Sequence, residues 1–256
     1  MIQIQLCGLF TLMKKEIVRI FRIWTQTLLS SVVNITLYFL IFGSFIGDRI
    51  APFMEVSYMA FLLPGLIMLA IVSNSFSNVA STFFTSKFQK SIEELLVAPL
   101  HPLIILLGYV SGGFVRGILV ATLVTTVSLL FVPLAIYDFS LMILCISLTA
   151  LLFSLFGLFT GIFANRFDDI ALIPSFVLTP FTYLGGVFYS ISMLPPFWQK
   201  LSLFNPILYL VNLLRYAFLG ISDIPVRPAL FTLSVMVCVM FGLCYWMLAK
   251  GIRIKT

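Results

Sequence analysis

Residues 140–163 read SLMILCISLTALLFSLFGLFTGIF and contain no charged side chain. A helix of about 20 apolar residues is long enough to cross the hydrocarbon of a bilayer, so this segment predicts a transmembrane helix. The whole chain has the same character, since 61% of its 256 residues are hydrophobic and 9% are charged. Soluble domains carry about 25% charged residues. The composition indicates an all-α integral membrane protein and excludes a water-soluble enzyme or a nucleic-acid-binding protein.

Five other segments have similar length and hydropathy, which gives six predicted transmembrane helices. The six are expected at about 24–47, 58–83, 103–131, 140–163, 170–189 and 229–249. A further apolar run, 207–219, is too short to span, and it follows Pro195-Pro196 and Asn205-Pro206. Because prolines interrupt helices, we expect residues 190–220 to form a re-entrant or interfacial hairpin between the fifth and sixth spans.

Residues 3–23 have an amphipathic pattern. Apolar residues recur there at steps of three and four, and basic residues fall between them. The apolar set is Leu6, Phe10, Met13, Ile17, Ile20 and Trp24, and the basic set is Lys14, Lys15, Arg19 and Arg22. The pattern predicts an interfacial helix whose basic face lies along an anionic membrane surface. A cytosolic helix packed on a partner protein is the alternative, and the two are compatible.

The distribution of Lys and Arg predicts the orientation. With six spans, ten of these residues lie on the side of the N-terminus and four on the other side, while Arg116 lies within the third span. The ten are Lys14, Lys15, Arg19, Arg22, Lys87, Lys90, Arg166, Lys250, Arg253 and Lys255, and the four are Arg49, Lys200, Arg215 and Arg227. Cytoplasmic loops retain Lys and Arg, so both termini are predicted to be cytoplasmic and the 190–220 hairpin extracytoplasmic.

Two of the predicted spans carry polar stripes at helical spacing. The stripes are Gln26, Ser30, Asn34 and Tyr38 in the first span, and Asn74, Asn78 and Ser81 in the second. Polar groups in hydrocarbon need partners, so the stripes are expected to face other helices or a wet cavity. Interhelical hydrogen bonding explains any single residue, whereas the two stripes together indicate a polar-lined interface or a translocation path. For Arg116, a role in that path and a structural role both stay open.

Glycines four residues apart recur in the third and fourth spans. The pairs are Gly108–Gly112, Gly113–Gly117 and Gly157–Gly161. This spacing allows two helix backbones to approach closely, so the glycines predict tight helix packing.

The loop after the second span, residues 86–99, contains a short amphipathic pattern that ends at Pro99. Its apolar face consists of Phe88, Ile92, Leu95 and Leu96. An isolated helix of this length is marginal in water and needs a surface on which to dock. The acidic pair Glu93 and Glu94 disfavours anionic lipid, so we expect this helix to dock on a cytosolic partner protein.

The sequence lacks the usual patterns for catalysis, metal binding and nucleotide binding. It has one histidine, His101, and no G-x-x-x-x-G-K-S/T motif, and its four cysteines are not at metal-ligand spacing. Asp168 and Asp169 are adjacent in sequence and point apart on a helix, so we expect them at a helix start and not as an acid–base pair. No catalytic residue, metal site or cofactor is therefore expected in this chain.

Residues 184–215 carry the most specific motif. LGGVFY (184–189), MLPPFW (193–198), NPILY (205–209) and Arg215 occur in this order. With these residues, and with IEELLVAP at 92–99, the chain resembles the membrane subunits of ABC-2 type transporters over essentially its whole length. The residues that match the family signature are Gly185, Gly186, Leu194, Pro195, Pro206, Tyr209 and Arg215. Phe181 departs from it, because the signature prefers an aliphatic residue at that position.

The resemblance implies one ABC-2 type transmembrane domain over residues 1–256, in a bacterial inner membrane. It implies two copies of this chain, and two copies of a separate ATP-binding subunit that would bind ATP and Mg²⁺. It also implies that the 86–99 segment is the coupling helix. Its expected contacts with the ATPase are Phe88, Ile92, Glu93, Glu94 and Leu95. The signature residues and the 190–220 hairpin are expected to form the outer gate.

An ATP-driven exporter permease is therefore the first functional hypothesis. The expected cargo is an amphipathic or lipid-like small molecule or a glycan, and aromatic residues near the outer half of the path, such as Tyr38 and Phe188, would bind it or simply pack. An intramembrane enzyme is a second hypothesis, and it would need paired acids, histidine or metal ligands within the spans. A channel or assembly scaffold that needs no ATPase is the third.

Overall fold

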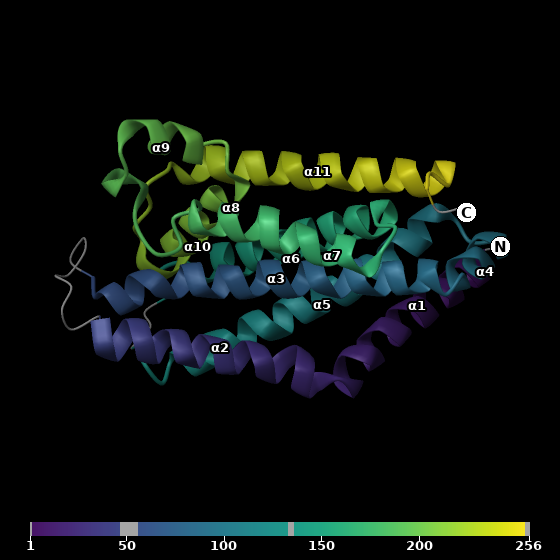
Figure 1. Ribbon diagram of the computed structural model, residues 1–256, viewed down its shortest axis with the longest axis horizontal. Helices are drawn as coiled ribbons and strands as arrows, with labels where there is room; N and C mark the ends of the chain where they lie inside the picture. The colour runs from purple at the N-terminus through teal and green to yellow at the C-terminus, as the bar shows by residue number, and fades with distance from the viewer. Residues whose placement is uncertain (1, 47–55, 133–135, 254–256) are drawn as a thin grey trace.

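The computed structural model describes residues 2–46, 56–132 and 136–253, with the side chains of 3–42 in the first of these ranges. All regular elements in these ranges are helices, and they form an elongated bundle (Figure 1). One end, here the α4 end, contains the start of α1, the end of α11 and α4; the α9 end lies opposite. Arg49 and Lys255, which contribute to the predicted orientation, lie outside the described residues.

The elements follow one another along the chain as a series of long helices joined by shorter ones. In order they are α1 (Ile2–Arg22), η1 (Thr25–Leu29), α2 (Ser30–Tyr38), η2 (Phe39–Ile46), α3 (Tyr58–Phe88), α4 (Ser91–Val97), α5 (Pro102–Ser128), α6 (Phe139–Phe163), α7 (Phe167–Ile173), η4 (Pro174–Leu178), α8 (Thr179–Tyr183), η5 (Ile191–Met193), α9 (Pro196–Ser202), α10 (Pro206–Leu219) and α11 (Val226–Lys250). Here η1, η2 and η4 are π-helical turns, and η5 is a 3-10 turn.

Five of the six predicted spans are confirmed as helices that are long and apolar enough to cross a membrane. They are Thr25–Phe42, α3, α5, α6 and α11. The predicted span 170–189 is wrong in its bounds, because α7, η4 and α8 run without a gap only from Phe167 to Tyr183. The chain then turns, with Gly186 in the left-handed region at φ +73°. By length and composition alone, α9 and α10 together could also count as a span, but they are bent by 89° where they join.

Side-chain caps set where the long helices begin. Ser57 Oγ accepts the amide of Ala60 at the start of α3, and Asp138 Oδ1 accepts the amide of Leu141 near the start of α6. These bonds satisfy amides that have no partner within the helix, so they stabilise the observed starting positions.

The predicted close packing at glycines is confirmed, and it places α3 at the centre of the bundle. A Cβ atom on Gly157 of α6 would lie 2.5 Å from the carbonyl oxygen of Phe76 in α3. A Cβ atom on Gly113 of α5 would lie similarly close to Ser75 and Val79 of α3. Only glycine allows backbones to approach so closely, and α3 is consequently buried between α5 and α6.

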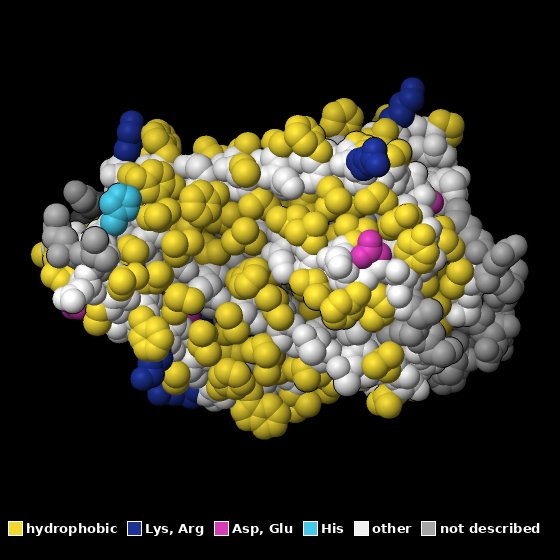
Figure 2. Space-filling model, turned by 180° about the vertical axis from the view of Figure 1, so that it is seen from behind, with side chains coloured by type: hydrophobic (Ala, Val, Ile, Leu, Met, Phe, Trp, Pro, Cys, Tyr) yellow, Lys and Arg dark blue, Asp and Glu magenta, His cyan; other side chains and the backbone are white. Residues whose placement is uncertain are grey.

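The surface of the bundle is mostly apolar between its two ends. Figure 2 shows hydrophobic side chains covering the middle of one face, with the Lys and Arg side chains gathered towards the ends. This distribution suits a protein whose middle lies in hydrocarbon and whose ends reach the polar interfaces.

Helix α1 packs along α5, but it does not use the predicted apolar face as a whole. Leu12, Glu16 and Ile20 are buried, whereas Leu6 and Phe10 are 60% and 69% exposed. The two glycines at the start of α5 explain the register, because Gly108 receives Leu12 and the next glycine, four residues on, receives Glu16. The helix thus has one face on the bundle and leaves a second, apolar face uncovered.

Candidate functional site

A polar groove runs between η1 and α2, the middle of α3, and the α7–η4–α8 segment. It consists of two neighbouring cavities of about 410 Å³ and 180 Å³. Ser77 and Pro174 line both, so the two cavities adjoin each other along the groove. The larger cavity lies towards the α4 end and the smaller towards the α9 end, because they follow α3 from Ser81 to Ser73.

Two arginines from different helices line the larger cavity. Arg116 of α5 donates from Nε and Nη2 to Asn74 Oδ1, at 3.2 and 2.8 Å. Asn74 in turn donates to Ser31 Oγ of α2 at 3.0 Å, which links three helices across the groove. Arg19 of α1 donates to Asn78 Oδ1 at 2.9 Å. The predicted polar stripe of the second span therefore serves chiefly to hold guanidinium groups in place.

Glu16 is the acidic partner of this arrangement, and the sequence analysis did not single it out. Its side chain is buried against Gly112, with one carboxylate oxygen 3.4 Å from Nη2 of Arg19. Burial raises the pKa of Glu16, since removing a carboxylate from water disfavours its charged form, and the positive charges of Arg19 and Lys15 only partly oppose this. Its position as the sole acid on a basic helix was the available signal.

The α9 end of the groove is aromatic. Phe188 lies within 5.7 Å of the ring centres of both Phe42 and Tyr183, and 6.2 Å from that of Tyr38. Tyr38 also stacks on Phe42 at 5.9 Å. Such spacings are those of packed aromatic pairs, so the rings form a single cluster that closes this part of the groove.

The predicted path residues divide into two groups. Gln26, Tyr38 and Arg116 line the groove, and Asn74 and Asn78 bind the arginines that line it. Two others, Ser30 and Asn34, are exposed on the surface of α2 and line neither cavity. The first-span stripe is therefore split between the groove and the outer surface of the chain.

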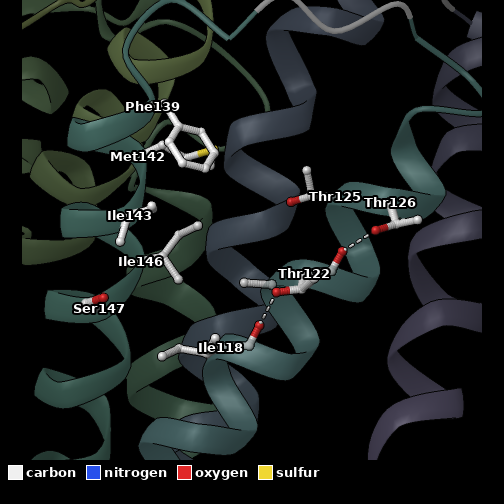
Figure 3. Close-up of a pocket in the computed structure, with 10 residues that line it drawn as sticks. Ile118, Thr122, Thr125, Thr126, Phe139, Met142, Ile143, Ile146 and Ser147 are labelled. Carbon is white, nitrogen blue, oxygen red and sulfur yellow. Dashed lines mark hydrogen bonds between the residues drawn. The ribbon is translucent and has the colours of Figure 1, made fainter.

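Another cavity, of about 290 Å³, lies between α5 and α6 (Figure 3). Two of its three threonine hydroxyls are used within their own helix, since Thr122 donates to Ile118 O at 3.0 Å and Thr126 donates to Thr122 O at 2.8 Å. The remaining lining is largely apolar and includes Phe139 and Met142. This hollow offers packing surface but no charged group, so it is a weaker candidate for recognition.

The predicted coupling segment is a shorter helix than 86–99. Helix α4 spans Ser91–Val97, because Lys90 adopts a left-handed conformation (φ 60°) that separates it from α3. The prediction that Phe88 and Ile92 share one face is therefore wrong. Phe88 is the last residue of α3, and its ring lies 5.1 Å from that of Phe167.

The side chains of α4 differ in their exposure. Ile92 is 1% exposed, so it anchors the helix on the bundle and is not available to a partner protein. Glu93 and Leu95 are partly buried, and Glu94 is exposed. Val97 is 87% exposed and presents an apolar side chain on the surface of α4. The exposed side chains of α4 are thus Glu94 and Val97, and Phe88 at the end of α3 is also exposed.

Hydrogen bonds tie the α4 region to three long helices. Gln5 of α1 donates to Pro99 O at 2.6 Å and accepts the amide of His101 at 2.9 Å. Lys87, near the end of α3, donates to Ile162 O and Ala164 O at the end of α6. These bonds connect α1, α3 and α6 to the segment that contains α4.

The family-signature residues meet at the α9 end. Arg215 of α10 is 1% exposed; it donates to Gly186 O at 2.7 Å, lies 3.7 Å from Asp223 Oδ2, and stacks on Phe61. Asp223 also accepts a hydrogen bond of 2.6 Å from Ser190. The buried cation thus joins the turn after α8 to the segment after α10, a contact that the sequence analysis did not predict.

The other signature residues shape the turns around Arg215. Gly185 sits where a Cβ would lie 2.8 Å from Ile207, and Tyr209 donates to Leu203 O at 2.8 Å. Pro206 is at the start of α10, and Leu194 O accepts from Gln199 ahead of the bend in the hairpin. Pro195, another signature residue, immediately precedes α9.

The acidic pair after α6 is at a helix start, as expected. Asp169 accepts the amides of Asn165 and Arg166 at 2.8 and 3.0 Å. These two bonds hold the pKa of Asp169 below its usual value, because they favour the charged carboxylate. Among the described residues there is no group of three or more His, Cys, Asp or Glu side chains that could hold a metal.

These features define a polytopic membrane protein: long apolar helices, close packing of α3 with α5 and α6, and a buried Arg215 among the signature residues. Residues 8–219 match the ABC-2 type transporter family, and the chain belongs to that family. It is 51% identical over 242 residues, 94% of each chain, to the inner membrane transport permease YadH of Escherichia coli K12. It is 26% identical to nodulation protein J of Neorhizobium galegae over 198 residues, which cover 76% of this chain and 74% of that protein.

Proposed function

We propose that this chain is the permease subunit of an ATP-driven exporter in a bacterial inner membrane. Two copies form the translocation path, and each binds a separate ABC-type ATP-binding subunit that holds ATP and Mg²⁺. Both termini and α4 face the cytoplasm, and the α9–α10 hairpin is re-entrant from the outer side. Membership of the ABC-2 family and the 51% identity to an inner membrane transport permease support this proposal.

The observation that carries the coupling proposal is the shape of α4. A seven-residue helix is too short to be stable alone, and here one buried side chain, Ile92, holds it on the bundle. Its outward surface combines the exposed apolar side chain of Val97 with the carboxylate of Glu94, and Phe88 at the end of α3 is also exposed. Such a surface suits a protein cleft better than water or anionic lipid.

In this proposal, the polar groove is the part of the path that each copy contributes. It lies on the side of the chain formed by α2 and the α7–α8 segment, whose exposed residues would face the second copy. The cargo is an amphipathic or lipid-like molecule or a glycan. Movement of α4 would change the groove, because α3 leads directly into α4 and Lys87 ties α3 to α6. ATP hydrolysis can drive this movement only if the ATPase contacts α4 differently in two conformations of the permease.

The coupling proposal is tested by co-purification with a candidate ATP-binding subunit from the same genome. Val97→Asp places a charge on the most exposed apolar side chain of α4, at the last residue of the helix. Its matched control is Phe204→Asp at the α9 end, because Phe204 is 86% exposed and Val97 is 87% exposed. We expect Val97→Asp to abolish retention of the ATPase and Phe204→Asp to leave it unchanged.

Two outcomes would contradict the proposal. Equal retention and equal stimulated ATP hydrolysis in the two variants would exclude α4 as the docking helix. If the unmodified chain retains no ATP-binding subunit at all, a channel or an assembly scaffold becomes the better reading.

The outer gate is a separate part of the proposal and has its own test. The hairpin is bent by 89° between α9 and α10, and the buried Arg215 holds it to the turn after α8. A crosslink between the hairpins of two copies should block export if they must move. Undiminished transport by the crosslinked dimer would exclude gating by this segment.

A further inference from the structure

The larger cavity of the groove is positively charged. Its lining contains the two guanidinium groups of Arg19 and Arg116 and no carboxylate. The two lie close enough for their positive charges to repel each other. Their hydrogen-bond partners, Asn74 and Asn78, are neutral amides, which hold the groups without cancelling their charge.

The nearest acidic side chain, Glu16, neutralises the charge of Arg19 only in part. Glu16 contacts Arg19 at 3.4 Å, which is longer than a charge-assisted hydrogen bond. Nε of Arg19 is buried without a hydrogen-bond partner. Arg19 is a partly buried cation, since 30% of its side chain is exposed, and its carboxylate contact is long, so an anion in the cavity would add the counter-charge that it lacks.

A second cavity adjoins this one along the groove. The two share Ser77 and Pro174 in their walls, and the smaller one is also lined by Leu69, Leu178 and Phe188. A molecule held at its charged end by the arginines could therefore lay an apolar chain along the groove towards the aromatic cluster. This geometry fits an amphipathic molecule whose charged head lies at the membrane interface and whose apolar chain lies within one leaflet, along α3.

We propose that Arg19 and Arg116 form a binding site for a phosphate-type anion carried by an amphipathic molecule. The inference rests on the proposed transport function only in assigning that molecule as cargo. The shared recognition chemistry is that of phosphate, and guanidinium groups bind it with directed, charge-assisted hydrogen bonds. A lipid headgroup and a free phosphate would both satisfy it, so the test separates them.

Binding is measured on the full-length permease in detergent, without any ATPase, at about 150 mM salt so that long-range attraction is screened. The probes are dioctanoylphosphatidic acid, dioctanoylglycerol with the same tails and no phosphate, and inorganic phosphate with no tails. We expect phosphatidic acid to bind about tenfold more tightly than the diglyceride, since hydrogen bonds to charged groups contribute that much or more. The double variant Arg19→Gln, Arg116→Gln should remove this preference.

Arg22→Gln is the matched control, because Arg22 lies on the same helix and outside this cavity. It should change the affinity by less than about twofold. Ala171→Trp gives a second test, in case loss of Arg116 prevents folding. Ala171 is an exposed wall residue, so the larger side chain should block the cavity while leaving both charges in place.

Competition by inorganic phosphate, at concentrations similar to those of phosphatidic acid, would support the anion site and assign it to a free anion. Absence of competition alongside tight lipid binding would support it and assign it to a lipid headgroup. Equal binding of phosphatidic acid and diglyceride would overturn the proposal, as would an equal loss in Arg22→Gln and the double variant. Because no ATPase is present, failure here is distinguishable from failure of the coupling proposal.

Discussion

Replacing Gly157 by alanine is a direct test of the central packing. The new Cβ would lie 2.5 Å from Phe76 O and 3.2 Å from Ala80 N, and both are backbone atoms of α3. Neither can rotate away, as the end of a flexible side chain could. Relief to an ordinary contact requires α6 to move from α3 by about 1 Å, which would disturb packing along the whole interface.

The magnitude follows from two opposing effects. Overpacking a tight interface costs about 1–3 kcal/mol. Replacing a helical glycine by alanine returns up to about 1 kcal/mol. We therefore expect a net loss of up to about 2 kcal/mol, which for a chain of this size lowers the midpoint of thermal unfolding by up to about 8 °C.

The assay is the thermal midpoint of purified protein in detergent, read from the monodisperse fraction that remains after a fixed heating time. Gly242→Ala in α11 is the control, since no atom lies within 4 Å of its added Cβ. The control should be neutral or slightly stabilising. Equal midpoints for Gly157→Ala and Gly242→Ala would refute the close α3–α6 approach.

Three further predictions concern polar contacts of Gln5, Glu16 and Asp223. Gln5→Ala removes both hydrogen bonds from α1 to the loop before α5, so amide hydrogen exchange in the first turns of α1 should rise about tenfold; an unchanged rate would refute the tie. Burial raises the pKa of Glu16, so its protonation stabilises the fold at low pH and this contribution is lost as pH rises through the raised pKa. Glu16→Gln should therefore raise the thermal midpoint at pH 8 and have less effect at pH 5, whereas a larger gain at pH 5 would reverse the sign. Asp223→Asn leaves Arg215 buried without its counter-charge and should cost about 3 kcal/mol, while the exposed control Asp168→Asn should cost little; equal midpoints would contradict the ion pair.

Hydropathy predicted the long helices well because a bilayer imposes a length and an apolar composition on every span. Four of the predicted spans, those that became α3, α5, α6 and α11, differ from the observed helices by five residues or fewer at each end; the largest difference is in α3, which runs on to Phe88. The segment 170–189 was harder. Its apolar character continues past Tyr183, but the double glycine lets the chain turn there, and the apolar residues beyond it pack inside the bundle. Hydropathy measures burial and does not distinguish lipid from protein surroundings.

The candidate site depended on contacts between distant residues, which single-helix patterns do not encode. Spacing alone placed Asn74 and Asn78 on one face, yet the arginines they bind come from two other helices. Likewise, helical periodicity placed Phe88 and Ile92 on a common face, because it could not anticipate the left-handed Lys90 between them. A non-glycine residue rarely adopts that conformation, so the sequence carried little signal for it.

The two proposals meet at α3. In the proposed mechanism, the ATPase displaces α4, and α3 moves with it because only two residues separate the helices. The Arg19–Asn78 hydrogen bond, 2.9 Å long, joins α3 to α1, and such a bond is lost beyond about 3.5 Å. A relative movement of about 1 Å would therefore break this bond and the longer one of 3.3 Å from Arg19 to the carbonyl oxygen of Asn78, leaving Arg19 with Glu16 of its own helix. An anion bound by Arg19 would gain or lose its partner with that movement, which is the differential contact that coupling of cargo binding to ATP hydrolysis requires.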